Sequence, residues 1–364
     1  MSHVSCARRP SARKQLVNPR RTLLVALVAA LLLPSGAGDA ARAAAGHHDP
    51  VRTLPDIGRV NGRALSTQDK ITGFDGLSYD SAPFVVPGLD GELFLGPDFD
   101  IACGLGPRYE RALKTFAKVA RIIEKSGRRA IFTAAPNKST VLPQELDAGQ
   151  LPHGQCDRDG IAAQSRILDK FRDPSYLPLR KALAQSNHQT YWKTDPHWTS
   201  VGGAVLAQEV ARKLDPRLAR RQHYAYGTET GLGMLNADQG DPTTETIETA
   251  LPDNGVKVKT APGCDEWAGY PTLIYDTCWN SGPAKKTWPG QTLLLGDSFM
   301  MYGLQSLRPL FHHGRWMWVG HSNRDVAKAI KASDTVVLEV LQIFVPGTII
   351  ATKSLRKELR RTLL

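Results

Sequence analysis

The sequence lacks three features that would each indicate a particular class of protein. No segment of about 20 to 50 residues repeats, which excludes a solenoid. No two cysteines have the C-x-x-C spacing of structural zinc sites, and no apolar run reaches the length of about 20 residues that a membrane-spanning helix needs. A full-sized core is nevertheless available, because apolar residues make up 41% of the 364 residues.

The first 45 residues differ in composition from the rest of the chain. A basic stretch is followed by an unbroken apolar run from Leu23 to Leu33 and by the small residues Ala43 to Ala45. This order is typical of a secretory signal peptide, so we expect an exported protein that is periplasmic, bound to the cell envelope or extracellular. Whether the signal is cleaved or retained is left open.

The charge of the chain does not point to nucleic acid. The first 45 residues carry seven Lys or Arg and one Asp, so their removal would lower the formal charge from +11 to +5. This mildly basic remainder suits an anionic polymer or an anionic membrane surface, and it carries no nucleic-acid signature.

Four cysteines remain beyond the signal, which in an exported protein predicts two disulfides. Three connectivities are open for Cys103, Cys156, Cys264 and Cys278. We favour Cys103–Cys156 and Cys264–Cys278, because each pair flanks one loop-rich region.

The remaining chain predicts one α/β domain. Residues 46–83 are expected to be a polar lead-in. The domain itself is expected at 84–345, with a loop and β region inserted at 218–291. Residues 346–364 are expected to form a basic C-terminal helix that could meet a membrane surface or be solvated. Strands alternate with helices, which predicts a mostly parallel sheet covered on both faces. Strands are expected at 129–134, 190–193, 292–295, 315–319 and 335–341, and helices at 108–125, 160–171, 178–185, 201–214, 300–310, 324–331 and 352–363.

The apolar run from Thr292 to Leu295 stops abruptly at Gly296, Asp297 and Ser298. Such a run indicates a buried parallel strand that delivers a hydroxyl to the carboxyl edge of the sheet, where ligands bind in folds of this kind. Ser298 is therefore the candidate nucleophile. The alternative is an ordinary helix N-cap.

A serine nucleophile needs a base and a third group that orients the base. Asp195 and His197 lie two positions apart, joined by Pro196, so a local turn could let the carboxylate meet one ring nitrogen while the other faces Ser298. The alternative is a surface Asp beside a half-buried His. No second histidine pair lies nearby, so a metal site is not expected.

An acyl transfer also needs donors for the oxyanion. The backbone N–H groups of Ser298 and Phe299 and the side chain of Asn137 are candidates, although loop asparagines often form Asx turns instead. Lys138 could hold an anionic sugar or be solvated. Trp198 could stack on a sugar ring or fill the core.

At these motifs the chain resembles the SGNH hydrolase-like domain of the alginate O-acetyltransferases of the AlgJ and AlgX type. The supporting segments run in the family's order over roughly residues 84 to 342, with the Asp/His pair before the serine, as in this permuted branch. They are Gly88–Leu95, Pro136–Val141, Asp195–Thr199, Gly296–Phe299 and Val337–Val340. Two positions depart from the family pattern: Glu92 stands in place of a tryptophan, and Gln342 in place of an acidic residue.

The resemblance implies the SGNH hydrolase-like fold and an O-acetyltransferase that needs no cofactor. Ser298 would be the nucleophile, His197 the base and Asp195 its orienting partner. It also implies a polysaccharide hydroxyl as acceptor and a membrane-bound O-acyltransferase as the source of acetyl groups. A carbohydrate esterase and a non-catalytic polysaccharide-binding protein remain the alternatives, because a transferase and an esterase share the same triad.

Overall fold

The computed structural model describes residues 59–60, 63–64, 82–105, 108–261, 276–346, 350 and 352–364. The expected signal peptide, most of the lead-in and Cys264 lie outside the described residues. Two short strands, β1 (Arg59–Val60) and β2 (Arg63–Ala64), form a separate antiparallel pair.

A six-stranded sheet with the order β5-β12-β10-β11-β9-β8 forms the centre of the fold. The first four strands are parallel, and the last two join antiparallel, which confirms the expected mostly parallel sheet. The strands are β5 (Arg129–Ala135), β12 (Thr335–Leu341), β10 (Trp288–Gly296), β11 (Phe311–Trp318), β9 (Thr277–Gly282) and β8 (Lys257–Thr260).

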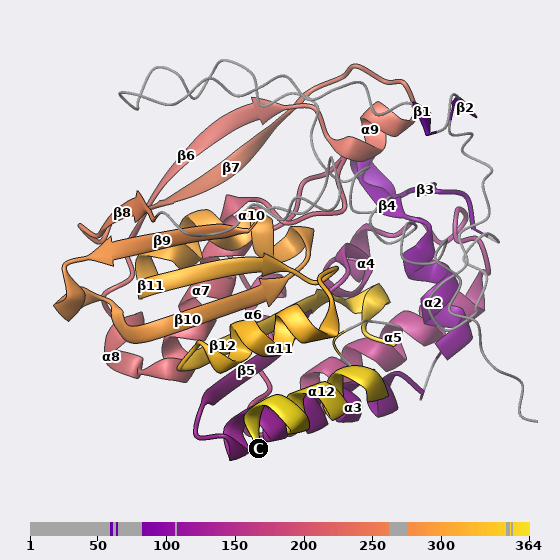
Figure 1. Cartoon of the computed structure of the whole chain (residues 1–364). Coiled ribbons are helices and arrows are strands. Elements are labelled where there is room, and N and C mark those ends of the chain that lie inside the picture. Colours follow the sequence, from indigo (N-terminus) through magenta and orange to yellow (C-terminus); the bar gives the residue numbers. More distant parts are fainter. Residues whose placement is uncertain are drawn as a thin grey trace, which may run out of the picture.

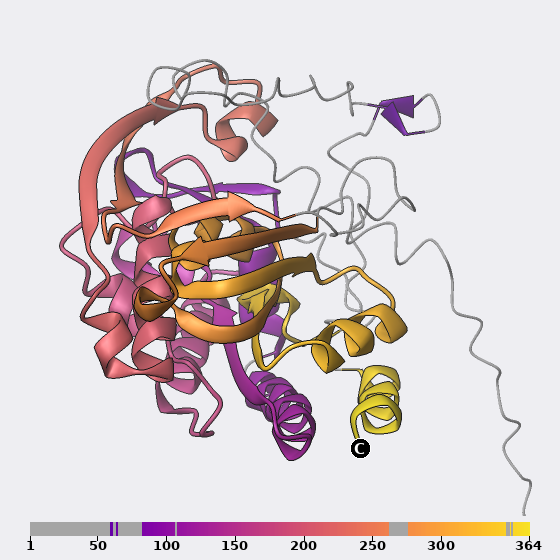
Figure 2. The same cartoon turned by 60° about the vertical axis from the view of Figure 1, so that its left-hand side comes forward.

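Helices cover both faces of this sheet (Figures 1 and 2). Helices α7 (Ser200–Leu214) and α10 (Ser298–Leu307) pack together on one face. The opposite face carries α3 (Arg108–Lys125), α11 (Asn323–Lys331) and α12 (Lys353–Leu363). Because both faces are covered, Leu293, Leu294 and Leu295 in β10 are completely buried, as expected of a central parallel strand.

Smaller elements surround this core. An antiparallel hairpin near the start of the domain consists of β3 (Val85–Pro87) and β4 (Leu93–Leu95), with the short helix η2 (Leu89–Gly91) between them. The remaining helices described are α2 (Pro97–Leu105), α4 (Lys138–Val141), α5 (Gln155–Lys170), α6 (Arg180–Ala184), α8 (Pro216–Ala219) and α9 (Met234–Asp238), with short 3₁₀ turns η3 (Pro143–Glu145), η4 (Ala284–Lys286), η5 (Arg308–Leu310) and η6 (Gln342–Phe344).

The region expected to be loop and β structure at 218–291 serves two structural purposes. Strands β6 (Tyr224–Gly231) and β7 (Glu245–Pro252) form a long antiparallel ribbon of their own. Strands β9 and β8 instead extend the central sheet beyond β11. The region therefore contributes to the main sheet as well as to a peripheral ribbon.

The expected strand at 190–193 is wrong. Only an isolated bridge joins Tyr191 to Trp198, and the Thr199 N–H donates to the Thr190 carbonyl at 2.9 Å. The Trp192 N–H likewise donates to the His197 carbonyl at 3.3 Å. The segment therefore closes a tight loop instead of entering the sheet, because Thr190 and Trp192 find backbone partners within that loop.

The disulfide between Cys103 and Cys156 is present and joins α2 to α5 across 53 residues of chain. Cys278 is also disulfide-bonded. Since Cys264 lies outside the described residues, its pairing with Cys278 stays a prediction.

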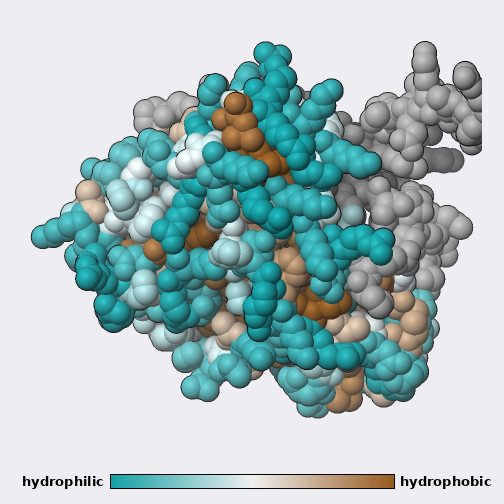
Figure 3. All heavy atoms as spheres, turned by 90° about the horizontal axis from the view of Figure 1, so that it is seen from below, coloured by the Kyte–Doolittle hydropathy of each residue, from teal (hydrophilic) through white to brown (hydrophobic). Residues whose placement is uncertain are grey.

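The C-terminal helix α12 is amphipathic. It buries Leu355 and Leu359 and leaves Lys357, Arg360 and Arg361 exposed. Figure 3 shows the molecule from this side, where the surface is mostly hydrophilic with small separate hydrophobic areas. In the part of the chain that the structure describes, no helix combines the length and the apolar character needed to cross a bilayer.

Two glycines let α7 and α10 approach closely. A Cβ on Gly203 would lie 3.0 Å from the Cα of Gly303 and 3.2 Å from the Tyr302 carbonyl oxygen. Both neighbours are main-chain atoms, which cannot swing aside as a flexible side chain would. Since α10 begins at Ser298, this contact helps to set where that hydroxyl lies.

We expect Gly203→Ala to lower the free energy of unfolding by about 1–3 kcal/mol, because it overpacks the contact between the two helices. The matched control is Gly104→Ala in α2, where an added Cβ would meet nothing within 4 Å and should leave stability unchanged or raised by up to about 1 kcal/mol. Urea denaturation of both variants measures this. Equal effects would contradict close packing at Gly203.

Candidate active site

Ser298 lies where β10 passes into α10. The side chain of Asp297, and not that of Ser298, caps the helix: its Oδ1 accepts the Phe299 N–H at 3.0 Å. The N-cap explanation for Ser298 is therefore wrong. Its hydroxyl instead lies 2.9 Å from Nε2 of His197, so it is free of helix capping and engaged with an imidazole.

The same imidazole contacts Asp195 on its other side. Nδ1 of His197 lies 2.7 Å from Oδ1 of Asp195. A proton on Nδ1 would be held by the carboxylate, which would leave Nε2 as the acceptor for the Ser298 hydroxyl. All three side chains are at most 3% exposed. The structure thus brings together the serine, histidine and aspartate in one hydrogen-bonded chain.

Backbone donors fix the Asp195 carboxylate. Oδ1 accepts the His197 N–H at 2.8 Å and Oδ2 the Met234 N–H at 2.9 Å. Burial alone would raise the pKa of Asp195, but the His197 ring and these two N–H groups outweigh it and hold the pKa below its ordinary value. Asp195 is therefore an anion at neutral pH.

The loop that carries Asp195 is anchored by Glu245 at the start of β7. This carboxylate accepts the N–H groups of Lys193 and Thr194, both at 2.9 Å, and the Thr194 hydroxyl at 2.6 Å. Together with Met234 from α9, Glu245 belongs to the 218–291 region. Sequence reasoning missed both residues, because nothing in their local pattern marks them as neighbours of Asp195.

Aromatic rings enclose the imidazole. Tyr302, one turn into α10, stacks on His197 with ring centroids 4.4 Å apart and an interplanar angle of 17°. Phe299 lies at 4.8 Å from the same ring, and Trp198 packs against Phe299 edge-on. Trp198 is completely buried, so it fills the core and the sugar-stacking hypothesis for it is wrong.

Asn137 follows β5 at the same edge of the sheet, separated from β10 only by β12. Its backbone N–H donates to Oε1 of Gln342 at 3.0 Å, and Gln342 also accepts the Thr140 hydroxyl. The side-chain amide, by contrast, is 1% exposed and has no hydrogen-bond partner among the described residues on either its nitrogen or its oxygen. Such a group is costly unless something binds it, and it forms no Asx cap.

Lys138 is neither solvated nor open to a ligand. Its side chain is 1% exposed, and Nζ contacts the carbonyl oxygens of Leu93 and Lys193 and, at 2.5 Å, the carboxylate of Glu92. The ammonium group is thus hydrogen-bonded to two carbonyl groups and paired with one carboxylate. Both expectations for Lys138 are therefore wrong, since the buried charge is compensated inside the protein.

The Phe299 N–H, expected as an oxyanion donor, is already used by Asp297. No hydrogen bond to the Ser298 N–H is found among the described residues. Of the donors expected for the oxyanion, the Ser298 N–H and the Asn137 amide thus remain open, and the buried Nε1–H of Trp198 also has no partner among the described residues.

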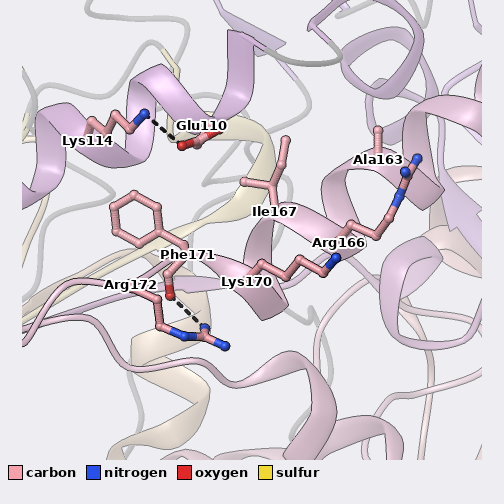
Figure 4. A pocket seen from close by; sticks show the side chains of 8 residues that line it. All are labelled: Glu110, Lys114, Ala163, Arg166, Ile167, Lys170, Phe171 and Arg172. Carbon is pink, nitrogen blue, oxygen red and sulfur yellow. Dashed lines mark hydrogen bonds and ion pairs between the residues drawn. The ribbon is translucent and has the colours of Figure 1, made fainter.

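A surface cavity of about 640 Å³ lies between α3 and α5 (Figure 4) and is not lined by any residue of the Ser298 site. Its lining residues are Glu110, Lys114, Ala163, Arg166, Ile167, Lys170, Phe171 and Arg172. Within the described ranges, no group of three or more His, Cys, Asp or Glu side chains could hold a metal ion.

Comparison with known proteins shows which family the chain resembles. Residues 85–249 match the model of the SGNH hydrolase-like domain of acetyltransferase AlgX. The resemblance to the AlgJ and AlgX family is confirmed. The matched range includes Asn137, Asp195 and His197 and ends before Ser298.

Two curated relatives are named probable alginate O-acetylase AlgJ. The protein from Pseudomonas putida is 25% identical over 233 residues, which cover 62% of this chain and 58% of the relative. The protein from Pseudomonas syringae pv. tomato is 25% identical over 214 residues, which cover 54% and 52%. The match thus spans little more than half the length of these relatives.

Two solved structures of AlgJ and AlgX also match part of the chain. The O-acetyltransferase domain of Pseudomonas putida AlgJ has a TM-score of 0.45 and 17% identity, over 76% of this chain and 98% of that domain. Pseudomonas aeruginosa AlgX has a TM-score of 0.45 and 13% identity, over 77% of this chain and 65% of its own.

The carboxyl group of Asp98 is buried beside the loop that carries Asn137, and its raised pKa should make the stability of the protein depend on pH. Its carboxylate accepts the Ser139 hydroxyl at 3.0 Å, and burial raises its pKa from 3.8 to about 7, against the opposing effect of that hydrogen bond. Between these two pH values the folded state binds more protons than the unfolded state, so the free energy of unfolding falls as pH rises.

We expect Asp98→Asn to remove this pH dependence. The variant should match the wild type near pH 4 and exceed it at pH 8 by an amount on the order of a few kcal/mol. Urea denaturation across this range measures the difference. A stability difference that does not change with pH would contradict the raised pKa.

Proposed function

We propose that this protein is an exported O-acetyltransferase that moves an acetyl group through an acyl-Ser298 intermediate onto a polysaccharide hydroxyl. The observation that carries the proposal is the hydrogen-bonded chain from Ser298 through His197 to Asp195. The confirmed family resemblance adds the reaction class, because the curated relatives are named alginate O-acetylases.

The geometry supports the following steps. His197 Nε2 takes the proton of Ser298 as Oγ attacks the acetyl carbonyl of the donor, and Asp195 holds the imidazolium that forms. His197 then returns the proton to the leaving group of the donor. In the second half, His197 accepts the proton of a sugar hydroxyl that attacks the acyl-serine, and passes it back to Ser298 Oγ.

The oxyanion in both halves needs donors. The Ser298 N–H and the Asn137 amide have no acceptor among the described residues, so both are available without breaking another hydrogen bond. Ser298 is also 2% exposed. Restricted access of bulk water to an acyl group there favours transfer to a bound sugar over hydrolysis.

Export and the partners complete the proposal. The basic and apolar segments at the start of the chain and the Cys103–Cys156 disulfide both suit an exported protein. We infer a membrane-bound O-acyltransferase as the source of the acetyl group and a polysaccharide of the cell envelope or outside the cell as acceptor. The polymer and the hydroxyl are left open.

Mass spectrometry of the purified protein tests the nucleophile and the direction of transfer together. After addition of an acetyl-ester donor we expect an acetyl adduct on Ser298. This adduct should disappear when an oligosaccharide is added, and the acetyl group should then be found as an ester on the sugar. Ser298→Ala should form no adduct. Fast release of acetate to water with no acetylated sugar would establish an esterase instead.

For Asn137 we expect the alanine variant to lower kcat by about 10²–10³-fold with little change in KM, since it removes a donor that acts on the developing oxyanion. Asn137→Asp, which keeps the shape but adds negative charge, should lose at least as much. Steady-state kinetics with the acetyl-ester donor measure both. Wild-type kcat in the two variants would exclude Asn137 from the oxyanion site.

A further inference from the structure

Glu339 is a buried carboxyl group that the steps above do not use. It lies within β12, next to β10, and is completely buried. Its Oε2 accepts the N–H groups of Asp297 at 3.2 Å and Met300 at 3.1 Å. Gly296 makes this approach feasible, because a Cβ there would lie 2.6 Å from Oε2. Glu339 thus contacts the turn on both sides of Ser298.

Asp297 completes a pair of buried carboxyl groups. Its Oδ2 accepts the Leu341 N–H at 2.7 Å, in addition to the Phe299 N–H on Oδ1. The carboxyl groups of Asp297 and Glu339 lie close enough to share a proton, and Oε1 of Glu339 receives no N–H or O–H donor among the described residues. Two carboxylates in such contact, shielded from water, cannot both be ionised without a large repulsion, so the pair holds a proton.

The proton belongs on Glu339. Burial and the nearby Asp297 raise the pKa of Glu339 well above its ordinary value. Burial also raises the pKa of Asp297, to about 6, but the Leu341 and Phe299 N–H groups and the His197 ring oppose this rise. At neutral pH the pair is therefore a carboxylic acid donating to a carboxylate.

Of the four backbone N–H groups from Asp297 to Met300, one has no acceptor in the described part of the chain. The N–H groups of Asp297, Phe299 and Met300 all donate to the two carboxyl groups. The Ser298 N–H lies among them and has no acceptor among the described residues. At the start of a helix, where several N–H groups are normally open, three of four consecutive donors are occupied.

We propose that Glu339, as a neutral acid, is a positioning residue for Ser298: it holds the turn through Asp297 and Met300 and leaves the Ser298 N–H for the oxyanion. The inference rests on the proposed acyl-Ser298 chemistry. An ionised Glu339 would add a second negative charge beside Asp297, against the oxyanion that the turn has to stabilise. The other titratable groups that face the pair are His197, on the Asp297 side, and Tyr191.

Three variants separate positioning from simple stabilisation of the fold. Glu339→Gln keeps a neutral group that can accept the two N–H bonds and donate to Asp297, so its rate per active site should stay within about threefold of wild type. Glu339→Ala should lower that rate by about tenfold or more. Asp157→Asn is the matched control, because Asp157 is equally buried but lies in α5.

The rate is measured as covalent labelling of Ser298 by a sulfonyl fluoride, followed by mass spectrometry and corrected for the folded fraction. Labelling requires a nucleophilic, correctly placed Ser298 but not acetyl transfer. It therefore tests the positioning role of Glu339 even if the protein does not transfer acetyl groups. A labelling rate in Glu339→Ala equal to that of Asp157→Asn would overturn the positioning role.

Infrared spectroscopy tests the protonation state without any reaction. The difference spectrum between wild type and Glu339→Gln at pH 7 should contain the carbonyl band of a neutral carboxylic acid, and that between wild type and Glu339→Ala should contain the same band. Carboxylate bands in its place would show that Glu339 is ionised at pH 7 and would contradict the proposed neutral state.

Discussion

The position of the His197 ring is the constraint on which the rest of the site depends. The ring has to face Asp195 through one nitrogen and Ser298, 101 residues later in the chain, through the other. The two neighbours approach it from different elements, one from a closed loop and one from the end of a strand. The hydrogen bond between His197 and Ser298 could not survive a shift of α7 against α10, and the Gly203–Gly303 contact fixes that distance with main-chain atoms.

Around this ring the protein provides internal partners for several buried polar and charged groups. Gln342 takes the Asn137 N–H, Glu92 and two carbonyl groups take the Lys138 ammonium, and Asp195 takes two backbone donors. The Asn137 amide and the Ser298 N–H are left over at the same sheet edge. Because an unsatisfied buried polar group costs free energy, the oxyanion proposed above would stabilise the site by giving the Asn137 Nδ2 and the Ser298 N–H an acceptor.

The sequence contains enough to predict the sheet edge but not the contacts beneath it. The apolar run into Gly296 predicts the strand, and the spacing of Asp195 and His197 predicts a pair that can turn toward a nucleophile. Glu339 within the apolar run Val336–Leu341 is a clear sign of a buried carboxyl group. Its partner Asp297 cannot be inferred, because that requires the order and register of β12 and β10.

Other predictions failed for reasons that are not local. Lys138 was expected in solvent or on a ligand because lysine is rarely buried, and Glu92, which neutralises it, is 46 positions away in the chain. Thr190 to Lys193 was expected as a strand because its residues favour β structure, whereas the loop pairs Tyr191 with Trp198. In both cases tertiary partners overrode a sound local preference.

The two departures from the family pattern show how such long-range partners preserve a site. A tryptophan at position 92 could not neutralise the Lys138 ammonium, so Glu92 and Lys138 are coupled, and the change of either alone would leave a buried charge unpaired. Gln342 accepts from Asn137 and Thr140 while its amide donates to Gln164 at 2.6 Å. A carboxylate could make the first two contacts but not donate the third. Each departure therefore has a partner elsewhere in the chain, and the loop that carries Asn137 keeps its place at the sheet edge beside Ser298.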